Sequence, residues 1–121
     1  MRFAALDADG LASALAGERP PFLLDVRSLE DYVAGHVPGA RHCPVHELSK
    51  RPRELPTSKV ARVIVFADTP RRGEAAANFL WMVGYADVAV ALGGLTAWRG
   101  PLETGPPPPP RAAGPELRIV P

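Results

Sequence analysis

Apolar residues along this chain fall into two kinds of segment: continuous runs, and residues repeated at helical spacing. Short strand candidates occupy residues 2–6 and 40–43, and continuous apolar runs occupy 22–26, 60–67 and 88–92. Such runs are typical of strands buried on both faces of a parallel sheet. The run at 60–67, VARVIVFA, is the richest in β-branched side chains and predicts the central strand.

Helical spacing accounts for most of what lies between these runs. We expect helices over 9–17, 72–83 and 94–98 and one helical turn at 45–48. A further short helix follows Ser28, with Leu29, Tyr32 and Val33 on its apolar side. Asp9 and Ser28 are the predicted N-caps, with Asp31 completing a capping-box variant after Ser28. Gly84 ends the long helix in the left-handed position. Strands that alternate with helices predict an α/β fold, with a central parallel sheet and helices on both faces.

Proline and glycine divide the rest of the chain. Residues 50–59 contain Pro52 and Pro56 and read as a surface loop, and residues 35–40 read as a turn. Five prolines at 106–110 favour a stiff polyproline II segment. We therefore predict one domain over residues 1–104 and a Pro-rich tail over 105–121, whose last residues, 116–121, either pair as an edge strand or stay loose. We prefer a simple tail to a docking ligand for an aromatic groove.

Composition and charge narrow the function. Fourteen basic and thirteen acidic residues leave a net charge of +1, whereas nucleic-acid binders usually carry a clear basic excess. The single cysteine, Cys43, excludes an intrachain disulfide. The apolar stretch 79–98 is cut by Gly84, Asp87 and the Gly93-Gly94 pair into pieces too short to span a membrane. We expect a cytoplasmic protein that binds neither nucleic acid nor membrane.

The loop after the central strand is the place where chemistry is expected, because ligands of open α/β sheets bind beyond the carboxyl ends of the strands. It reads Ala67-Asp68-Thr69-Pro70-Arg71-Arg72-Gly73. A tight loop at a helix N-terminus presents backbone N–H groups that favour an anion or a thiolate. None of its residues can act as a nucleophile.

Two segments resemble a known family. The run VIVFADTPRRGEAAANFLWMVGYADVAVALGGLTAW resembles the carboxyl half of a rhodanese domain, with these residues in register: Arg72, Ala76, Ala77, Leu80, Gly84, Tyr85, Gly93, Gly94 and Trp98. The run LLDVRSLEDYVAGHVPGARHCP resembles the amino half, through Leu23 to Arg27, Glu30, Gly35, His36, Pro38, Gly39 and Ala40. The resemblance covers roughly residues 5–104 and implies a single, three-layer rhodanese-like α/β domain.

The chain departs from the family at residue 67, the position of the family's sulfur-accepting cysteine. The resemblance implies sulfur transfer by a cysteine that takes sulfur from thiosulfate, and that cysteine aligns with Ala67. A methyl group can neither attack nor hold sulfur. The same absence excludes the related cysteine phosphatases, whose loop is also one residue longer. In addition, Pro70 removes one N–H donor and Asp68 adds a negative charge, while Arg71 and Arg72 restore positive charge suited to oxyanions.

Several other residues have two interpretations. Cys43 is either a relocated nucleophile or, as we prefer, a small buried hydrophobe. Asp25 and Arg27 either shape the pocket or hold the fold, and we favour the structural role. His36, His42 and His46 lack the carboxylate or cysteine that would complete a metal site, so we expect no metal and no cofactor.

Three large side chains, Phe79, Trp81 and Met82, make the long helix apolar nearly all round, which implies a second buried side. A neighbouring loop or the Pro-rich tail covers them, or they form a dimer or partner surface; both interpretations stay open.

The sequence thus predicts a domain silent in sulfur transfer that binds a small oxyanion (sulfate, thiosulfate or phosphate) or a protein partner. The alternatives are an active sulfurtransferase or redox protein using Cys43 or a partner's cysteine, and a scaffold assembled through this helix.

Overall fold

A five-stranded parallel sheet forms the centre of the molecule. The computed structural model describes residues 3–108. The strands are β1 (Ala4–Leu6), β2 (Phe22–Asp25), β3 (Arg41–His42), β4 (Arg62–Phe66) and β5 (Asp87–Ala91), in the spatial order β1-β5-β4-β2-β3. All four pairings are parallel. The predicted α/β class and the central position of the 60–67 run are therefore confirmed, although the strands are shorter than predicted.

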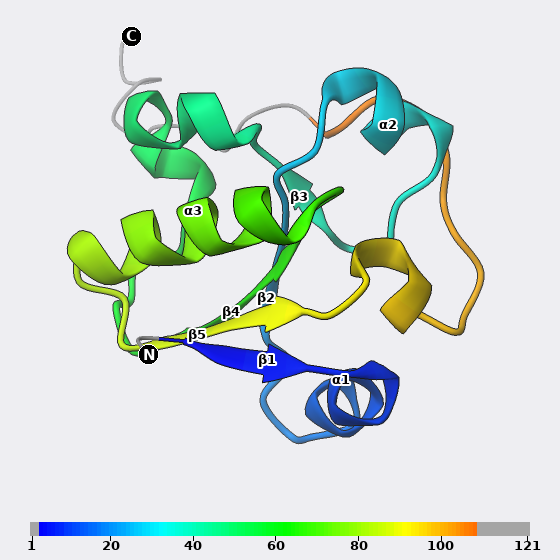
Figure 1. The fold of residues 1–121 in the computed structure, drawn as a ribbon, viewed down its shortest axis with the longest axis horizontal. Coiled ribbons are helices and arrows are strands. Elements are labelled where there is room, and N and C mark those ends of the chain that lie inside the picture. The colour runs from blue at the N-terminus through cyan, green and yellow to red at the C-terminus, as the bar shows by residue number, and fades with distance from the viewer. Residues whose placement is uncertain (1–2, 109–121) are drawn as a thin grey trace, which may run out of the picture.

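Helices cover both faces of this sheet. Three α-helices, α1 (Ala8–Leu15), α2 (Leu29–Ala34) and α3 (Pro70–Met82), and three 3₁₀ segments, η1 (Val45–Lys50), η2 (Pro52–Glu54) and η3 (Gly94–Ala97), connect the strands. Figure 1 shows α3 against one face and α1 against the opposite face. This is the three-layer arrangement that the sequence predicts.

The central strand supplies side chains to both layers, which explains its unbroken apolar run. Val63 and Val65 of β4 belong to the core beneath α3, η1 and η2. Ile64 and Phe66 belong to the core beneath α1 and η3. Successive side chains of a strand point to opposite faces, so a strand covered on both faces cannot alternate between apolar and polar residues.

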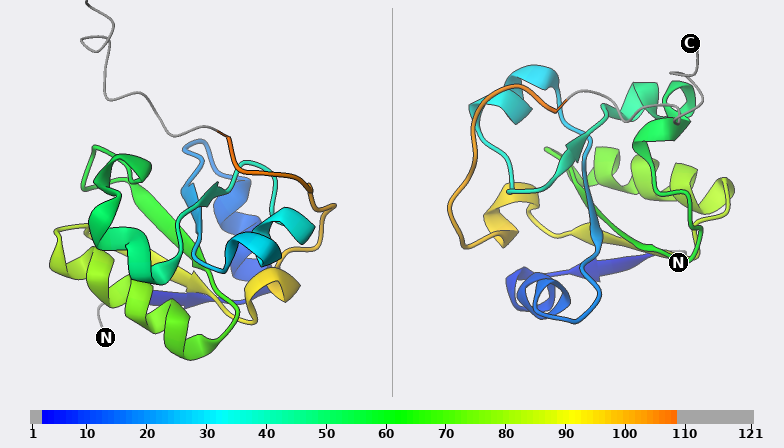
Figure 2. Two further views of the ribbon diagram at one scale, coloured as in Figure 1. Left: turned by 90° about the horizontal axis from the view of Figure 1, so that it is seen from above. Right: turned by 180° about the vertical axis from the view of Figure 1, so that it is seen from behind.

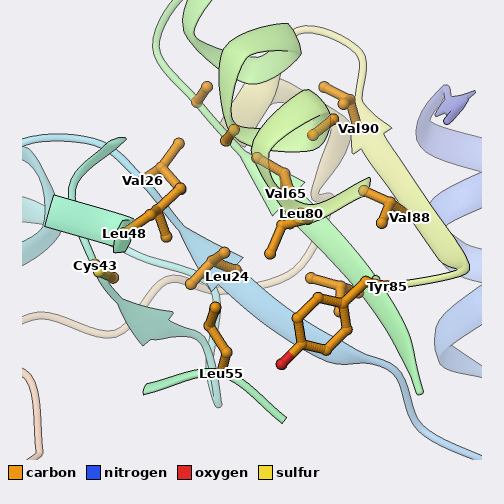
Figure 3. Packing of buried hydrophobic residues seen from close by; sticks show 14 residues of the cluster. Leu24, Val26, Cys43, Leu48, Leu55, Val65, Leu80, Tyr85, Val88 and Val90 are labelled. Carbon is orange, nitrogen blue, oxygen red and sulfur yellow. The ribbon is translucent and has the colours of Figure 1, made fainter. Parts of the chain in front are cut away.

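The core on the α3 side is the larger of the two. Ala76, Ala77 and Leu80 of α3 pack against Leu24 of β2 and the valines of the neighbouring strands. Figure 3 shows Leu80 and Leu24 at the middle of this cluster, with Leu55 and Tyr85 at one end. Gly73 sets how closely α3 approaches, since a Cβ atom there would lie 2.9 Å from Cγ1 of Val90.

Helix ends follow the predicted capping chemistry, with one correction. The Ser28 side chain accepts from the Asp31 N–H at 3.2 Å, and Gly84 has φ +108° just beyond α3. The N-cap of α1 is Asp7 and not Asp9: the Asp7 carboxylate accepts from the Gly10 N–H at 2.8 Å. Because β1 already ends at Leu6, the helix begins earlier than its apolar spacing suggests, and Asp9 falls in its first turn.

Two further predictions are corrected. The 50–59 segment is not purely a surface loop, since it holds η2, and Glu54 and Leu55 are buried beside it. The predicted apolar side of α2 is also wrong in part, because Tyr32 is buried whereas Leu29 and Val33 are exposed. The buried Tyr32 side chain therefore packs this short helix against the rest of the domain.

The chain returns along α2 after its last helical segment. Glu103 and His36 exchange two backbone hydrogen bonds of 2.9 Å, and the Gly105 N–H donates to the Val33 carbonyl at 2.9 Å. Figure 2 shows this segment passing alongside α2. The predicted pairing of residues 116–121 lies outside the described residues, as do Pro109 and Pro110 of the proline run. No helix of the described part has the length and apolar character needed to cross a membrane.

Candidate functional site

Ala67 lies at the carboxyl end of the central strand, at the wall of a small pocket. Ala67 directly follows β4, and 8% of its surface is exposed to solvent. The pocket has a volume of about 340 Å³ and is formed by β1, the start of α3 and the turn after β5. It is lined by Phe3, Ala5, Ala67, Asp68, Thr69, Pro70, Glu74, Val90, Ala91, Leu92, Gly93 and Gly94. The position therefore faces a space large enough for a small ligand.

The glycine pair after β5 closes this pocket against the loop. Gly94 has φ +60°, and a Cβ atom on it would clash with the Ala67 carbonyl oxygen. Gly93 also has a positive φ, of +78°. Only residues without a side chain let this turn lie so close to the end of β4. The Gly93-Gly94 pair thus lets the turn after β5 form one wall of the pocket beside Ala67.

The helix after the loop begins two residues earlier than predicted. α3 starts at Pro70, whose fixed φ and missing N–H suit a first helical position. The Thr69 hydroxyl accepts from the Arg72 N–H at 3.2 Å, and the Thr69 carbonyl accepts from the Gly73 N–H at 3.1 Å. The Arg72 and Gly73 amide groups are therefore hydrogen-bonded within the chain.

Asp68 and Arg72 form an ion pair across the loop. Nη1 of Arg72 donates to Oδ2 of Asp68 at 3.0 Å, between residues one helical turn apart. Both side chains are partly exposed, so the pair adds little to stability. The pair matters for ligand binding, because the Arg72 guanidinium, which we predicted to bind an oxyanion, already has the Asp68 carboxylate as its partner.

Asp25 and Arg27 form the most buried ion pair among the described residues, away from the pocket. Nη2 of Arg27 donates to Oδ2 of Asp25 at 2.7 Å, and its Nε donates to Oδ1 at 2.9 Å. The same Nη2 donates to the Gly35 carbonyl at 2.7 Å. Neither residue lines the pocket beside Ala67. The pair ties the end of β2 to the end of α2, which is the structural role that we favoured.

The three histidines occupy separate settings. His36 stacks on Tyr32 with ring centroids 3.7 Å apart, and one nitrogen of its ring lies 2.7 Å from the Tyr32 carbonyl oxygen. His42 is hydrogen-bonded to the Arg27 carbonyl, and His46 is exposed. Within residues 3–108 no group of three or more histidine, cysteine or acidic residues has the arrangement of a metal site. Two of the histidines are therefore parts of the packed interior.

Cys43 has the surroundings of a structural residue. Its side chain is fully buried in the core beneath α3 and η1, as Figure 3 shows. Burial raises the pKa of its thiol to about 11. The nucleophilic form of cysteine is the thiolate, so at neutral pH this side chain stays protonated and out of reach of substrate.

The C-terminal end of α3 carries the apolar side chains for which two interpretations were open. Phe79 is partly buried against the core, whereas Trp81 and Met82 are exposed, Met82 to 79%. No described loop covers these two side chains. The dimer or partner surface therefore stays a prediction, and most of the Pro-rich tail, the other predicted cover, lies outside the described residues.

Of the residues that line this pocket, the sequence predicted only those of the loop, Ala67 to Pro70. Ala5 lies in β1 and Phe3 directly precedes that strand, whereas Glu74 comes from the second turn of α3. β1 lies beside β5 because the sheet order is β1-β5-β4-β2-β3, although the two strands are far apart along the chain. The position of the Gly-Gly pair after the last strand was the available signal for this side of the site.

Comparison with known proteins agrees with this architecture. The family model of the rhodanese-like domain matches residues 7–101. YrkF of Bacillus subtilis (strain 168) is 33% identical over 81 residues, which are 67% of this chain and 43% of YrkF. A sulfurtransferase of Allochromatium vinosum is 28% identical over 93 residues, which are 77% of this chain and 85% of that protein. The chain thus spans less than half of the first relative and most of the second.

Solved structures lead to the same family. The crystal structure of the Alr3790 protein from Anabaena sp. superposes with a TM-score of 0.71 at 32% identity, over 82% of each chain. A thiosulfate sulfurtransferase from Pseudomonas aeruginosa gives a TM-score of 0.69 at 30% identity, over 85% of this chain and 20% of that one. The fold, the order of its motifs and these similarities agree: this chain belongs to the rhodanese-like domain family.

Proposed function

We propose that this rhodanese-like domain transfers no sulfur through residues of its own and acts as a non-catalytic binding module. The observation that supports the proposal is the methyl group of Ala67 at the end of β4, facing the pocket where a sulfur-accepting thiolate would be needed. Cys43 offers no replacement, because it is buried and its pKa is raised to about 11. Several relatives are named as sulfurtransferases, and the sulfur atom that such chemistry needs is missing at residue 67 of this chain.

The first test is a thiosulfate:cyanide sulfurtransferase assay, with native protein and Cys43→Ala side by side. We expect no thiocyanate above the uncatalysed background from either, and no added sulfur atom on the protein by mass spectrometry. The chemical reason is that sulfur transfer needs an accessible thiolate. Turnover by the native protein that is lost in Cys43→Ala would overturn the proposal and make Cys43 the nucleophile.

Oxyanion binding at the start of α3 is a second candidate, supported by the two arginines in the first helical turn. The Asp68 carboxylate competes for Arg72, so we expect the native loop to hold sulfate weakly. In Asp68→Asn the guanidinium loses its charged partner, and sulfate affinity should rise about two- to five-fold, the effect of one partly exposed charge pair. Titration calorimetry with sodium sulfate measures it. Glu18→Gln, an exposed carboxylate after α1, is the control, and equal affinities in all three proteins would exclude Arg72 as an anion ligand.

A further inference from the structure

The pocket beside Ala67 has an apolar wall built from two neighbouring strands, β1 and β5, which Figure 1 shows side by side. Ala5 of β1 and Val90 of β5 are register partners, and both line the pocket. Phe3, two residues before Ala5, packs against the same core as Val90. Leu92 directly follows β5 and is 53% exposed. These side chains offer a surface that the carbon skeleton of a small ligand can cover.

The charged side chains that line the pocket are both acidic. They are Asp68 and Glu74, and none of the described lysines, arginines or histidines lines it. Oδ2 of Asp68 is already bonded to Arg72. Glu74 is exposed and forms no ion pair within the described part of the chain. The Glu74 carboxylate therefore gives the pocket a negative charge that no ion-pair partner neutralises.

The start of α3 does not reverse this charge. The free N–H groups of a helix N-terminus carry about half an elementary positive charge, which is less than the full negative charge of Glu74. The Arg72 and Gly73 amides are already hydrogen-bonded to Thr69, and Pro70 has no N–H to offer. The pocket therefore attracts a cation more strongly than an anion.

We propose that this pocket binds a small organic amine, with its positive charge at Glu74 and its carbon skeleton on the apolar wall formed by Phe3, Ala5, Val90 and Leu92. The volume of about 340 Å³ is at the lower end of the range for ligand pockets, which suits a small molecule. The proposal rests on the role of the domain as a binding module and names the class of ligand. It is separate from sulfate binding at Arg72, because that residue does not line the pocket.

The test compares three probes of similar shape that differ in charge: phenethylamine, 2-phenylethanol and 3-phenylpropionate. Each is titrated into the full chain at low salt, and NMR chemical shifts give the affinity. We expect the amine to bind about two- to five-fold more tightly than the alcohol, the effect of one partly exposed charge pair, and the carboxylate to bind most weakly. Added salt should reduce the difference between amine and alcohol. Amide signals of residues 68–74 and 90–94 should shift first.

Two pairs of variants locate the two parts of the site. Glu74→Gln should weaken the amine about two- to five-fold and leave the alcohol unchanged, whereas Glu30→Gln, an exposed carboxylate of α2 outside the pocket, should change neither. Ala5→Phe fills the pocket and should abolish binding of all three probes. Ala4→Phe is its control, because Ala4 is exposed in the same strand and does not line the pocket.

Three results would each overturn the assignment of an amine: equal or tighter binding of the carboxylate, the same amine affinity in Glu74→Gln as in the native protein, or no saturation by the amine up to about 10 mM. The sulfurtransferase assay distinguishes this failure from that of the proposed function. An inactive protein that binds no amine loses only the ligand class, whereas thiocyanate production by the native protein overturns the non-catalytic role whatever the amine does.

Discussion

Replacing Asp25 by alanine is expected to lower the free energy of unfolding by about 3–5 kcal/mol, the usual cost of leaving one member of a buried ion pair without its partner. The Asp25 side chain is 1% exposed and the Arg27 side chain 9%. In the variant, the Arg27 guanidinium keeps its bond to the Gly35 carbonyl but loses the carboxylate that balances its charge. Since small domains are stable by only about 5–15 kcal/mol, this is a large share of the total.

Urea denaturation followed by circular dichroism measures this loss. The double variant Asp25→Leu/Arg27→Met removes both charges and should lose less than Asp25→Ala, because no buried charge is left unpaired. Glu30→Ala, an exposed acidic residue of α2, should change stability by no more than about 0.5 kcal/mol. A loss below about 1 kcal/mol in Asp25→Ala would show that water reaches Arg27 and that the pair does not hold β2 to α2.

Restoring a thiol at residue 67 is expected to create sulfurtransferase activity. In Ala67→Cys made in the Cys43→Ala background, the new sulfur faces the pocket of about 340 Å³ at the end of β4. Loss of a catalytic nucleophile costs an enzyme up to about 10⁶-fold in kcat. We expect only partial recovery, to about 10²-fold above the native background, because Pro70 lacks an N–H and Asp68 places a carboxylate beside the new thiolate.

The thiosulfate:cyanide assay measures this gain, and mass spectrometry detects the sulfur atom carried on residue 67. Ala67→Ser is the matched control, since it adds a polar atom of similar reach but no thiol, and it should stay at background. If Ala67→Cys reacts readily with iodoacetamide yet accepts no sulfur from thiosulfate, the start of α3 no longer stabilises the bound anion. The binding role would then have to lie outside the Ala67–Gly73 loop.

Local features of the chain were predictable because they depend on residues close in sequence. The unbroken apolar run of β4 indicated burial on both faces, and Ser28 and Gly84 marked helix ends through their own side chain or lack of one. The missing nucleophile is also a local fact, since a methyl group at residue 67 has the same chemistry in any fold. The resemblance to rhodaneses supplied the meaning of that position.

Only the tertiary structure decided which groups meet. The Arg27 guanidinium donates to the Asp25 carboxylate and to the Gly35 carbonyl, and Asp68 pairs with Arg72. The strand order places β1 beside β5 and so completes the pocket with Phe3 and Ala5. Each of these outcomes depends on which hydrogen-bond partners and apolar surfaces the packed chain brings within reach, and spacing along the sequence alone did not identify them.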